Sequence, residues 1–542
     1  MSLPVVTIAD APRLGLGADL LGGKGAGLAV MRGLGLPVPA GFVITTQVGR
    51  GYLRDRQVPS DVQHAIRGAV AQLEQETGRR LGDPHRPLIV SVRSGAVVSM
   101  PGMMNTVLNV GAPPAPPPGD GPAGARFVLD TRRRFLRGYA TTVLGIDEHP
   151  FAALEARHLP AGLACATGLA DLVDEFESVV AATGHVIPTD PFEQLEHAVE
   201  AVLASWGSRR ARTYRALHGI PDDLGTAVTV QCMVFGNRDH RSATGVAFSR
   251  DPTTGAPEPY GDVLFTAQGE DVVAGRRQTD RLASLGDRMP EAWAQLVDAM
   301  ATLECELCDM CNVEFTVDAG ELWLLQARRG SRTDRAAIRI AVDLADEGSI
   351  GRRDAVRRID PARVRSGDPT RDETIDAHAL ATGLGASPGV VTGRIATTAD
   401  EAVRLAEHGA VILVRPVTSP IDIHGIAASS GVLTSSGGPA SHAAVVARSM
   451  ATPAVVGAGD VHIDAGAATV TVGQTMLRAG DLLTIDGTSG AVIAGHARTT
   501  SSRRDHHLDR LLEWADDITG VPPGRLAAHE RLAAAHAVID RA

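Results

Sequence analysis

Residues 437–457 read GGPASHAAVVARSMATPAVVG and place one histidine, His442, shortly after a pair of glycines. The preceding sequence predicts a strand over 411–415, a helix, and a second strand over 431–435 that leads into those glycines. Small and apolar residues then predict another helix. A strand, a glycine turn and a helix in this order are typical of a mixed α/β domain, and here the turn carries a histidine.

His442 is predicted to lie in the first turn of that helix. Ser441 has the side chain of an N-cap, and residues 443–450 continue as a helix. Unpaired backbone N–H groups and the positive end of the helix dipole favour an anion attached to the ring. They also disfavour imidazolium, which leaves the neutral ring that a nucleophile needs. The position suits a phosphoryl carrier, although most histidines in proteins are solvated or structural.

The segment GGPASHAAVVAR resembles the phosphohistidine signature of the pyruvate, phosphate dikinase and phosphoenolpyruvate synthase family. In that family the histidine carries phosphate from a nucleotide site to a second active site. The resemblance implies that His442 is the phospho-carrier. Dikinases that are switched by phosphorylation have a threonine two residues before this histidine, whereas this chain has Ala440. Control by that modification is therefore not expected.

A glycine-rich turn near the start of the chain contains Lys24. Residues 19–46 read DLLGGKGAGLAVMRGLGLPVPAGFVITT, which predicts a turn, a short helix and a strand. Glycines let the backbone approach an anion closely, and a lysine adds a mobile positive charge. The spacing is not that of a Walker A loop, so a structural turn is the alternative. The whole segment is similar to the opening of the dikinase ATP-grasp domain, and Lys24 matches the family's ATP-phosphate lysine.

Residues 88–111, LIVSVRSGAVVSMPGMMNTVLNVG, predict a buried strand that runs into a loop with Arg93 at its mouth. An arginine offers a phosphate a planar fork of donors that cannot be deprotonated. The loop SMPGMMNT resembles the dikinase branch of the family, which implies inorganic phosphate as a cosubstrate. The resemblance also assigns Gly102 and Met103 to the nucleotide site. Core packing is the alternative for the methionines of this loop.

Three further segments extend the resemblance. Residues 126–146 predict an amphipathic helix whose Arg133 and Arg134 either reach a phosphate or form a solvated basic face. Residues 226–237 and the sequence after them have the strand and hairpin pattern expected of a nucleotide cleft. Only the resemblance assigns this region to the base or ribose, and it adds Glu270 to the nucleotide-binding residues.

Residues 312–330, NVEFTVDAGELWLLQARRG, predict two strands joined by a turn at 318–320. Strand alternation puts Asn312 and Glu314 on one face of the first strand. A hard cation such as magnesium prefers oxygen ligands and lies close to the phosphates that it binds. Asn312 and Glu314 are accordingly the candidate metal ligands. A solvent-facing hairpin is the alternative.

The second strand of this pair places Gln326 and Arg328 on one face. Glu314, Gln326 and Arg328 match residues of the dikinase family's nucleotide site, and the resemblance assigns Arg328 a catalytic role beside His442, Lys24 and Arg93. The family usually has a carboxylate where this chain has Asn312. An amide still offers an oxygen, but the negative charge is lost, which puts the affinity for a second metal ion in doubt.

Composition agrees with a large intracellular enzyme. The chain has 542 residues, of which 44% are hydrophobic and 21% are charged, so several cores can form. The formal net charge of −11 argues against a general nucleic-acid or membrane-surface binder. The sequence shows neither a signal-peptide pattern nor an apolar run long enough to span a bilayer, so the cytoplasm is the expected compartment.

The five cysteines do not make a disulfide framework in a chain of this size. Cys305, Cys308 and Cys311 have a CxxCxxC spacing, which can indicate zinc or an iron–sulfur cluster. These residues fall at the end of a predicted helix and the entry to a strand, and no fourth ligand follows at a useful spacing. Packing of small apolar thiols is the favoured interpretation.

The expected fold is multidomain, α/β and α+β, with an ATP-grasp nucleotide-binding domain followed by a swivelling phosphohistidine domain. We expect the nucleotide-binding domain over 1–330, a helical linker over 331–378, the mobile phosphohistidine domain over 379–497 and a helical tail over 498–542. The proline-rich stretch 111–124 is predicted to be an inserted loop. No internal repeat is evident.

The resemblance implies a phosphotransferase that uses ATP, Mg²⁺ and inorganic phosphate to phosphorylate His442. It covers roughly residues 20 to 520, and the motifs of the family's pyruvate-binding barrel are missing. The phosphoryl group is therefore expected to pass to pyruvate or another acceptor on a separate chain that carries a barrel. The alternatives are a phosphohistidine carrier or regulatory ATP-binding protein, and a degenerate remnant. A rifampicin-type phosphotransferase is disfavoured because the connector 331–378 is too short to be its antibiotic-binding domain.

Overall fold

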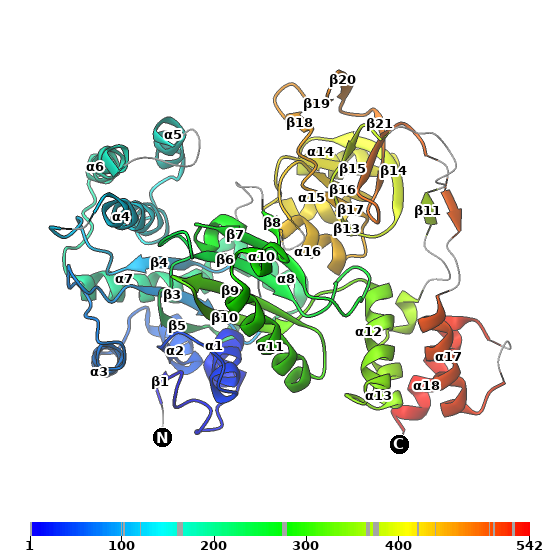
Figure 1. Cartoon of the computed structure of the whole chain (residues 1–542), viewed down its shortest axis with the longest axis horizontal. Coiled ribbons are helices and arrows are strands. Elements are labelled where there is room, and N and C mark those ends of the chain that lie inside the picture. Colours follow the sequence, from blue (N-terminus) through cyan, green and yellow to red (C-terminus); the bar gives the residue numbers. More distant parts are fainter. Residues whose placement is uncertain are drawn as a thin grey trace. The chain divides into compact units, whose positions relative to one another are not determined.

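The computed structural model divides the chain into two compact units. One comprises Met1–Ser242 with Thr316–Gln326, and the other comprises Ala243–Phe315 with Ala327–Ala542. Figure 1 follows the chain along its length. The structure describes residues 3–98, 100, 103–119, 121–159, 166–273, 279–364, 369–371, 379–419, 422–438, 441–497, 499–501, 505–522 and 526–541.

The first unit is built around an antiparallel five-stranded sheet in the order β1-β2-β5-β3-β4. Its central strands are rich in valine and buried along almost their whole length, which suits β-branched residues. Val92 pairs with Val230 at the centre of the sheet. The strands are β1 (Val5–Thr7), β2 (Gly41–Ile44), β3 (Val90–Gly95), β4 (Thr106–Val110) and β5 (Ala227–Cys232).

Most of the helices in the first unit share the hydrophobic core of this sheet. Aromatic side chains join three of the helices: Phe151 packs edge-on against Phe176 at 5.0 Å, and both lie in the same core as Phe135 and Tyr139. The helices are α1 (Ala18–Gly33), α2 (Thr46–Asp55), α3 (Ser60–Thr77), α4 (Pro122–Thr142), α5 (His149–His158), α6 (Ala166–Ala182), α7 (Pro191–Ala204) and α8 (Arg209–His218), with short 3₁₀ turns at Ser205–Gly207 and Asp222–Leu224. The helix predicted over 126–146 is α4, which begins and ends four residues earlier.

A second sheet has the order β10-β9-β6-β7-β8. The predicted hairpin of residues 312–330 is confirmed, because Ala319 and Gly320 link two long strands with φ angles of 54° and 94°. Two successive positive φ angles are what a tight two-residue hairpin requires. The strands are β6 (Ala243–Phe248), β7 (Tyr260–Phe265), β8 (Asp280–Arg281), β9 (Cys311–Asp318) and β10 (Glu321–Arg329), and the accompanying helices are α9 (Gly269–Val273), α10 (Ser284–Arg288) and α11 (Pro290–Leu307).

A third, eight-stranded sheet has the order β12-β22-β21-β14-β15-β16-β17-β13, with a parallel centre. Both faces are buried: Ile412 faces a three-stranded sheet, whereas Leu413 faces three helices. This arrangement explains why the central strands are continuously apolar. The elements are β12 (Ala381–Thr382), β13 (Leu384–Ser387), β14 (Val390–Ala396), α14 (Ala399–Ala406), β15 (Val411–Arg415), α15 (Ile423–Ala428), β16 (Gly431–Thr434), α16 (His442–Ser449), β17 (Ala454–Val456), the small sheet of β18 (Val461–Asp464), β19 (Thr469–Val472) and β20 (Thr475–Arg478), β21 (Leu482–Asp486) and β22 (Ala491–Ala494).

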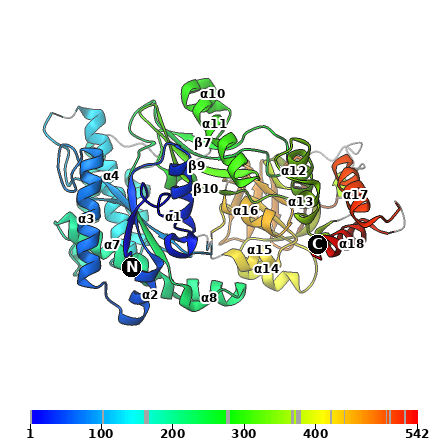
Figure 2. The ribbon, with the colours of Figure 1, turned by 90° about the horizontal axis from the view of Figure 1, so that it is seen from below.

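Four helices from two distant parts of the chain share one hydrophobic core. They are α12 (Asp334–Asp346), α13 (Arg352–Arg357), α17 (His506–Thr519) and α18 (Ala528–Ile539), with a 3₁₀ turn at Pro361–Arg363. Ile338, Val356, Trp514 and Leu532 meet in this core. The four helices lie together in both views (Figures 1 and 2).

The chain leaves these helices and returns to them through a short antiparallel ribbon. Its strands are β11 (Pro369–Arg371) and β23 (Thr499–Ser501), and Thr370 pairs with Thr500. Among the helices of the described residues, none has the length and apolar character that crossing a membrane requires.

Candidate functional site

His442 is the first residue of α16 and follows the turn after β16, as the sequence predicts. The Ser441 hydroxyl caps the helix by accepting a hydrogen bond from the Ala444 N–H at 3.4 Å. Gly437 has a φ of 101°, a conformation that favours glycine and turns the chain toward the helix. The imidazole therefore lies where backbone N–H groups at a helix start can receive an anion.

The surroundings of His442 favour a neutral ring. Burial lowers the pKa of His442, and the Asp422 carboxylate acts in the opposite direction without cancelling that effect. Its Nδ1 lies 3.2 Å from the hydroxyl of Thr418. If Nδ1–H donates to that hydroxyl, Nε2 keeps its lone pair free for attack on phosphorus.

Thr418 and Asp422 are neighbours of His442 that the sequence analysis missed. A signal for Thr418 existed, because β15 and β16 are parallel partners with Val414 opposite Leu433. Residues that follow the carboxyl ends of adjacent parallel strands lie at one edge of the sheet. Thr418 follows β15 and His442 follows β16, so their proximity could have been predicted.

The predicted glycine turn is instead part of α1, which contains Lys24 and is kinked at Gly22, and this kink packs against the end of β3. A Cβ at Gly22 would lie only 1.6 Å from the carbonyl oxygen of Gly95, and Gly22 has a φ of 67°, so only glycine fits. The next residue, Gly23, donates its N–H to the Ala96 carbonyl at 2.9 Å. The kink thus places Lys24 of α1 beside Gly95, at the end of the strand that carries Arg93.

Arg93 forms a contact between β3 and β10. One of its Nη atoms lies 3.4 Å from the carbonyl oxygen of Leu325, the residue before Gln326. Three side chains here are half-buried, namely those of Lys24, Arg93 and Gln326. Each is therefore held near its backbone while the rest of the side chain stays partly accessible. Within the first unit, the structure brings together two cations and a strand that the sequence analysis had assigned to phosphate binding.

Lys24 is the only lysine in the sequence, in which lysine and arginine together number 52. Arginine thus serves at every other cationic position. A lysine is a compact point charge, whereas an arginine presents a broad planar fork, and the two are not interchangeable against a phosphate. This compositional signal supports a special role for Lys24, and the sequence analysis missed it.

Asn312 and Arg328 form a partly buried hydrogen-bonded pair across β9 and β10. The Arg328 Nε donates to Asn312 Oδ1 at 3.2 Å, and Asn312 Nδ2 lies 3.4 Å from the Ala247 carbonyl oxygen. Asn312 is 3% exposed, whereas Glu314 and Arg328 are half-buried. The Asn312 amide accepts a hydrogen bond through its oxygen and donates one through its nitrogen. A carboxylate at this position could accept from Arg328 but could not donate to the Ala247 carbonyl. Whether Asn312 and Glu314 bind a metal stays a prediction.

The remaining assigned residues have varied surroundings. Met103 is buried in an apolar cluster with Met100 and Trp206, which agrees with core packing and leaves its nucleotide role a prediction. Glu270 is exposed on α9, and its role is also a prediction. Gly102 and Ala440 lie outside the described residues.

Arg133 and Arg134 do not form the solvated basic face that was one of their alternatives. Arg133 is buried and forms ion pairs with Asp130 and Glu155, and Arg134 also pairs with Asp130. Burial tends to raise the pKa of Asp130, but Arg134 and Arg133 hold that pKa well below its ordinary value. These contacts fix the two arginines within the helical part of the first unit.

The cysteines of the CxxCxxC segment occupy three different environments. Cys305 is exposed on α11, Cys308 follows that helix with a φ of 47°, and Cys311 is buried at the start of β9. Burial raises the pKa of the Cys311 thiol to about 12. Cys311 thus behaves as a small apolar core residue, whereas packing was the wrong prediction for Cys305, which is exposed.

Comparison with known proteins gives two family matches, which include Arg93 and His442 but not Lys24 or Arg328. Residues 50–294 match the pyruvate phosphate dikinase AMP/ATP-binding domain, and residues 408–490, which include His442, match the mobile domain of PEP-utilising enzymes. The chain is 45% identical over 525 residues to pyruvate, phosphate dikinase of Rhizobium meliloti (strain 1021), with 92% of this chain and 58% of that protein covered.

Two further relatives give similar figures. The chloroplastic pyruvate, phosphate dikinase of Flaveria pringlei is 42% identical over 92% of this chain and 54% of its own length. The pyruvate, phosphate dikinase of Clostridium symbiosum is 41% identical over 92% of this chain and 59% of its own length. The chain thus spans somewhat more than half the length of these relatives. With both domains matched and nearly all of its residues aligned, the chain belongs to the pyruvate, phosphate dikinase family.

Proposed function

We propose that the chain is an ATP-dependent phosphotransferase of the pyruvate, phosphate dikinase type that carries a phosphoryl group on His442. The observation that supports this most strongly is the environment of His442. A half-buried imidazole at the start of a helix, with a lowered pKa and Thr418 against Nδ1, suits a nucleophile that becomes an anion carrier.

The chemistry consists of two balanced displacements. The Nε2 lone pair of His442 attacks the β-phosphorus of ATP, the bond from that phosphorus to the oxygen shared with the α-phosphate breaks, and AMP leaves with the electron pair. Inorganic phosphate then attacks the γ-phosphorus, and the bond from that phosphorus to the oxygen shared with the β-phosphorus breaks, with the electron pair staying on that oxygen. The incoming phosphate and the γ-phosphoryl group leave together as pyrophosphate. The former β-phosphoryl group stays on His442, from which it passes to pyruvate or another acceptor.

Cationic and polar side chains are proposed to hold the nucleotide during these steps. Lys24, Arg93 and Arg328 would stabilise the charge that develops on the phosphoryl oxygens. Gln326 would orient the phosphates. Glu314 and Asn312 can each present an oxygen atom as a metal ligand, and oxygen ligands fit a magnesium ion. Such an ion would neutralise phosphate charge when bound.

Transfer to an acceptor is proposed to involve movement of the phosphohistidine domain. The proposed domains are those expected from the sequence: 1–330, 331–378, 379–497 and 498–542. The ribbon of β11 and β23 joins the helices α12, α13, α17 and α18 to the eight-stranded sheet, which makes it a suitable hinge. The acceptor is proposed to be bound by a separate chain that carries a pyruvate-binding barrel.

The nucleotide site can be tested through its single lysine. An acyl-phosphate derivative of ATP, which acylates amines near bound phosphates, should modify Lys24, and mass spectrometry should locate the adduct in the peptide around residue 24. Excess ATP should protect the residue. Since the sequence has no other lysine, the N-terminal amine serves as the internal control. Modification of Lys24 that ATP does not suppress would contradict the proposed site.

Asn312→Asp restores the acidic residue that is usual in the family and should strengthen the dependence of His442 phosphorylation on magnesium or manganese, because a carboxylate binds these ions better than an amide does. The new carboxylate can still accept from Arg328 but faces the Ala247 carbonyl without a proton to donate, so we expect a loss of about 1–3 kcal/mol in the free energy of unfolding. Metal titrations and denaturant unfolding measure the two effects. An unchanged titration would mean that Asn312 is not a ligand.

A further inference from the structure

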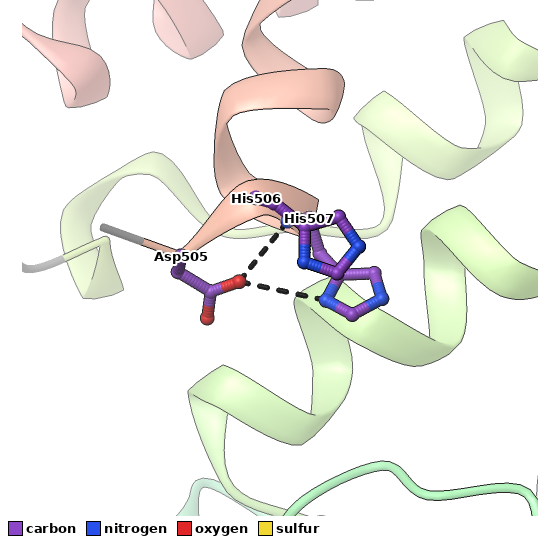
Figure 3. Close-up of side chains that lie close together, drawn as sticks. All are labelled: Asp505, His506 and His507. Carbon is purple, nitrogen blue, oxygen red and sulfur yellow. Dashed lines mark hydrogen bonds and ion pairs between the residues drawn. The ribbon is translucent and has the colours of Figure 1, made fainter. Parts of the chain in front are cut away.

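Asp505, His506 and His507 form a compact group at the start of α17, far in sequence from every residue assigned to the nucleotide or to His442. Figure 3 shows their side chains turned toward one another. Each can contribute one ligand atom such that the three atoms lie within 4.8 Å of one another. Among the described residues, no other group of three histidine, cysteine or carboxylate side chains has this property.

We propose that Asp505, His506 and His507 bind a divalent transition-metal ion, with zinc as the representative. His507 Nδ1 lies 3.5 Å from Asp505 Oδ1. Two ligands that are each about 2.1 Å from a tetrahedral zinc ion are about 3.4 Å apart, so these atoms have the spacing of a metal-bound pair. Two imidazoles and one carboxylate favour zinc and its neighbours over magnesium or calcium, which prefer sites made of oxygen alone.

The atoms of His507 and Asp505 that would not bind the metal have hydrogen-bonding or ionic partners that suit a metal site. His507 Nε2 lies 3.4 Å from Asp343 Oδ1, and a metal-bound histidine characteristically donates its other ring N–H to a carboxylate. Arg335 Nε lies 3.5 Å from Asp505 Oδ2, which leaves Oδ1 for the metal. Asp505 Oδ1 also accepts the His507 N–H at 3.1 Å, and a carboxylate oxygen has lone pairs for both interactions.

The group borders a cavity of about 300 Å³ that is also lined by Thr254, Arg335 and Arg339. A fourth ligand, either water or a small anion, has room to enter from this cavity. The positive charges of Arg335 and Arg339 balance the negative charges of Asp505 and Asp343. The charge of the metal ion is then uncompensated, which favours an anion over water as the fourth ligand. The geometry therefore describes a site with three protein ligands and one exchangeable ligand.

The bound ion would strengthen the contact between α12 and α17. The three ligands lie at the start of α17, Asp343 lies on α12, and the two helices share a hydrophobic core. Fixing His507 toward Asp343 orders the junction between the helices. The proposed ion acts on structure, and its binding does not depend on the phosphotransferase activity.

Equilibrium dialysis of the full chain against zinc, followed by elemental analysis, tests the site. His506→Ala removes an exposed ligand, and Asp505→Asn removes the charged ligand while keeping an N-cap residue. Each variant should bind one equivalent of zinc less than the unmodified chain at low micromolar free zinc. His529→Ala, an exposed histidine on α18, is the matched control and should retain that equivalent.

A second measurement separates this site from the cysteines. Cobalt bound to the chain should give visible absorption without an intense thiolate-to-metal band, and Cys305→Ser with Cys308→Ser should leave both the spectrum and the stoichiometry unchanged. Circular dichroism and thermal melting in the absence of metal verify that His506→Ala and Asp505→Asn are folded. Equal zinc stoichiometry in the unmodified chain and in these folded variants would overturn the proposal.

Discussion

Replacing His442 with alanine should abolish the acid-labile, base-stable label that the purified chain acquires from radiolabelled ATP. The imidazole is the proposed point of attachment, and neither of its two described polar neighbours can replace it: Thr418 would give an ester of different stability, and Asp422 an acyl phosphate that base destroys. The measurement is label retained on the denatured protein after brief treatment with acid or base, with peptide mapping to residue 442.

The control for this variant is His462→Ala. His462 is exposed on β18 within the same matched mobile domain, and none of the proposed steps involves it. Labelling should be unchanged in that variant. Full labelling of His442→Ala, or an adduct mapped to another histidine, would show that the carrier is misassigned.

Lys24→Ala or Arg328→Ala should lower the rate of His442 labelling by about a hundredfold or more, the usual cost of removing a preorganised charge from developing phosphoryl charge. Lys24 lies in α1 just after the kink at Gly22, which packs closely against Gly95, and Arg328 donates a hydrogen bond to Asn312. Both cations are therefore held in place before ATP arrives. Rapid-quench labelling at saturating ATP measures the chemical step.

Two variants sharpen this test. Lys24→Arg keeps the charge but changes its shape, and it should recover only part of the rate, because a guanidinium cannot take the position of a compact ammonium group. Arg329→Ala removes the exposed neighbour of Arg328 on β10 and should leave the rate unchanged. Normal rates in both Lys24→Ala and Arg328→Ala would show that the nucleotide cleft is misassigned.

Local signals in the sequence predicted the elements around the proposed carrier. Gly437, the Ser441 cap and the small apolar residues after it were sufficient to place His442 at the start of a helix. The hairpin turn at 318–320 was predicted for the same reason, because both features depend on residues close together in the sequence. The helix began at His442 itself and ended at Ser449, a difference of one residue at each end from the predicted range.

Long-range packing accounts for what could not be predicted. Charge and helical periodicity marked 331–378 as a connector and 498–542 as a tail, but neither pattern shows that Ile338 and Trp514 share a core. The ion pairs that enclose Arg133 likewise join α4 to a residue of α5, and local periodicity carries no information on that partner. The metal-binding group at Asp505 was missed because two adjacent histidines form no recognised spacing motif.

Some assignments depend on resemblance more than on physical reasoning. The glycine turn at Lys24 was too short to identify from spacing, and Glu270 and Gly102 have no chemical signal of their own. Lys24 could have been identified independently, since a lone lysine among so many arginines marks a position where the two side chains are not equivalent.

The source of the phosphoryl group on His442 distinguishes the dikinase mechanism from direct transfer of the γ-phosphate. The chain is incubated with inorganic phosphate, magnesium and ATP labelled either at the β- or at the γ-position, and label is then measured on His442. We expect stable label from β-labelled ATP, with γ-label released as pyrophosphate. Stable label that comes only from the γ-position would contradict the proposed mechanism.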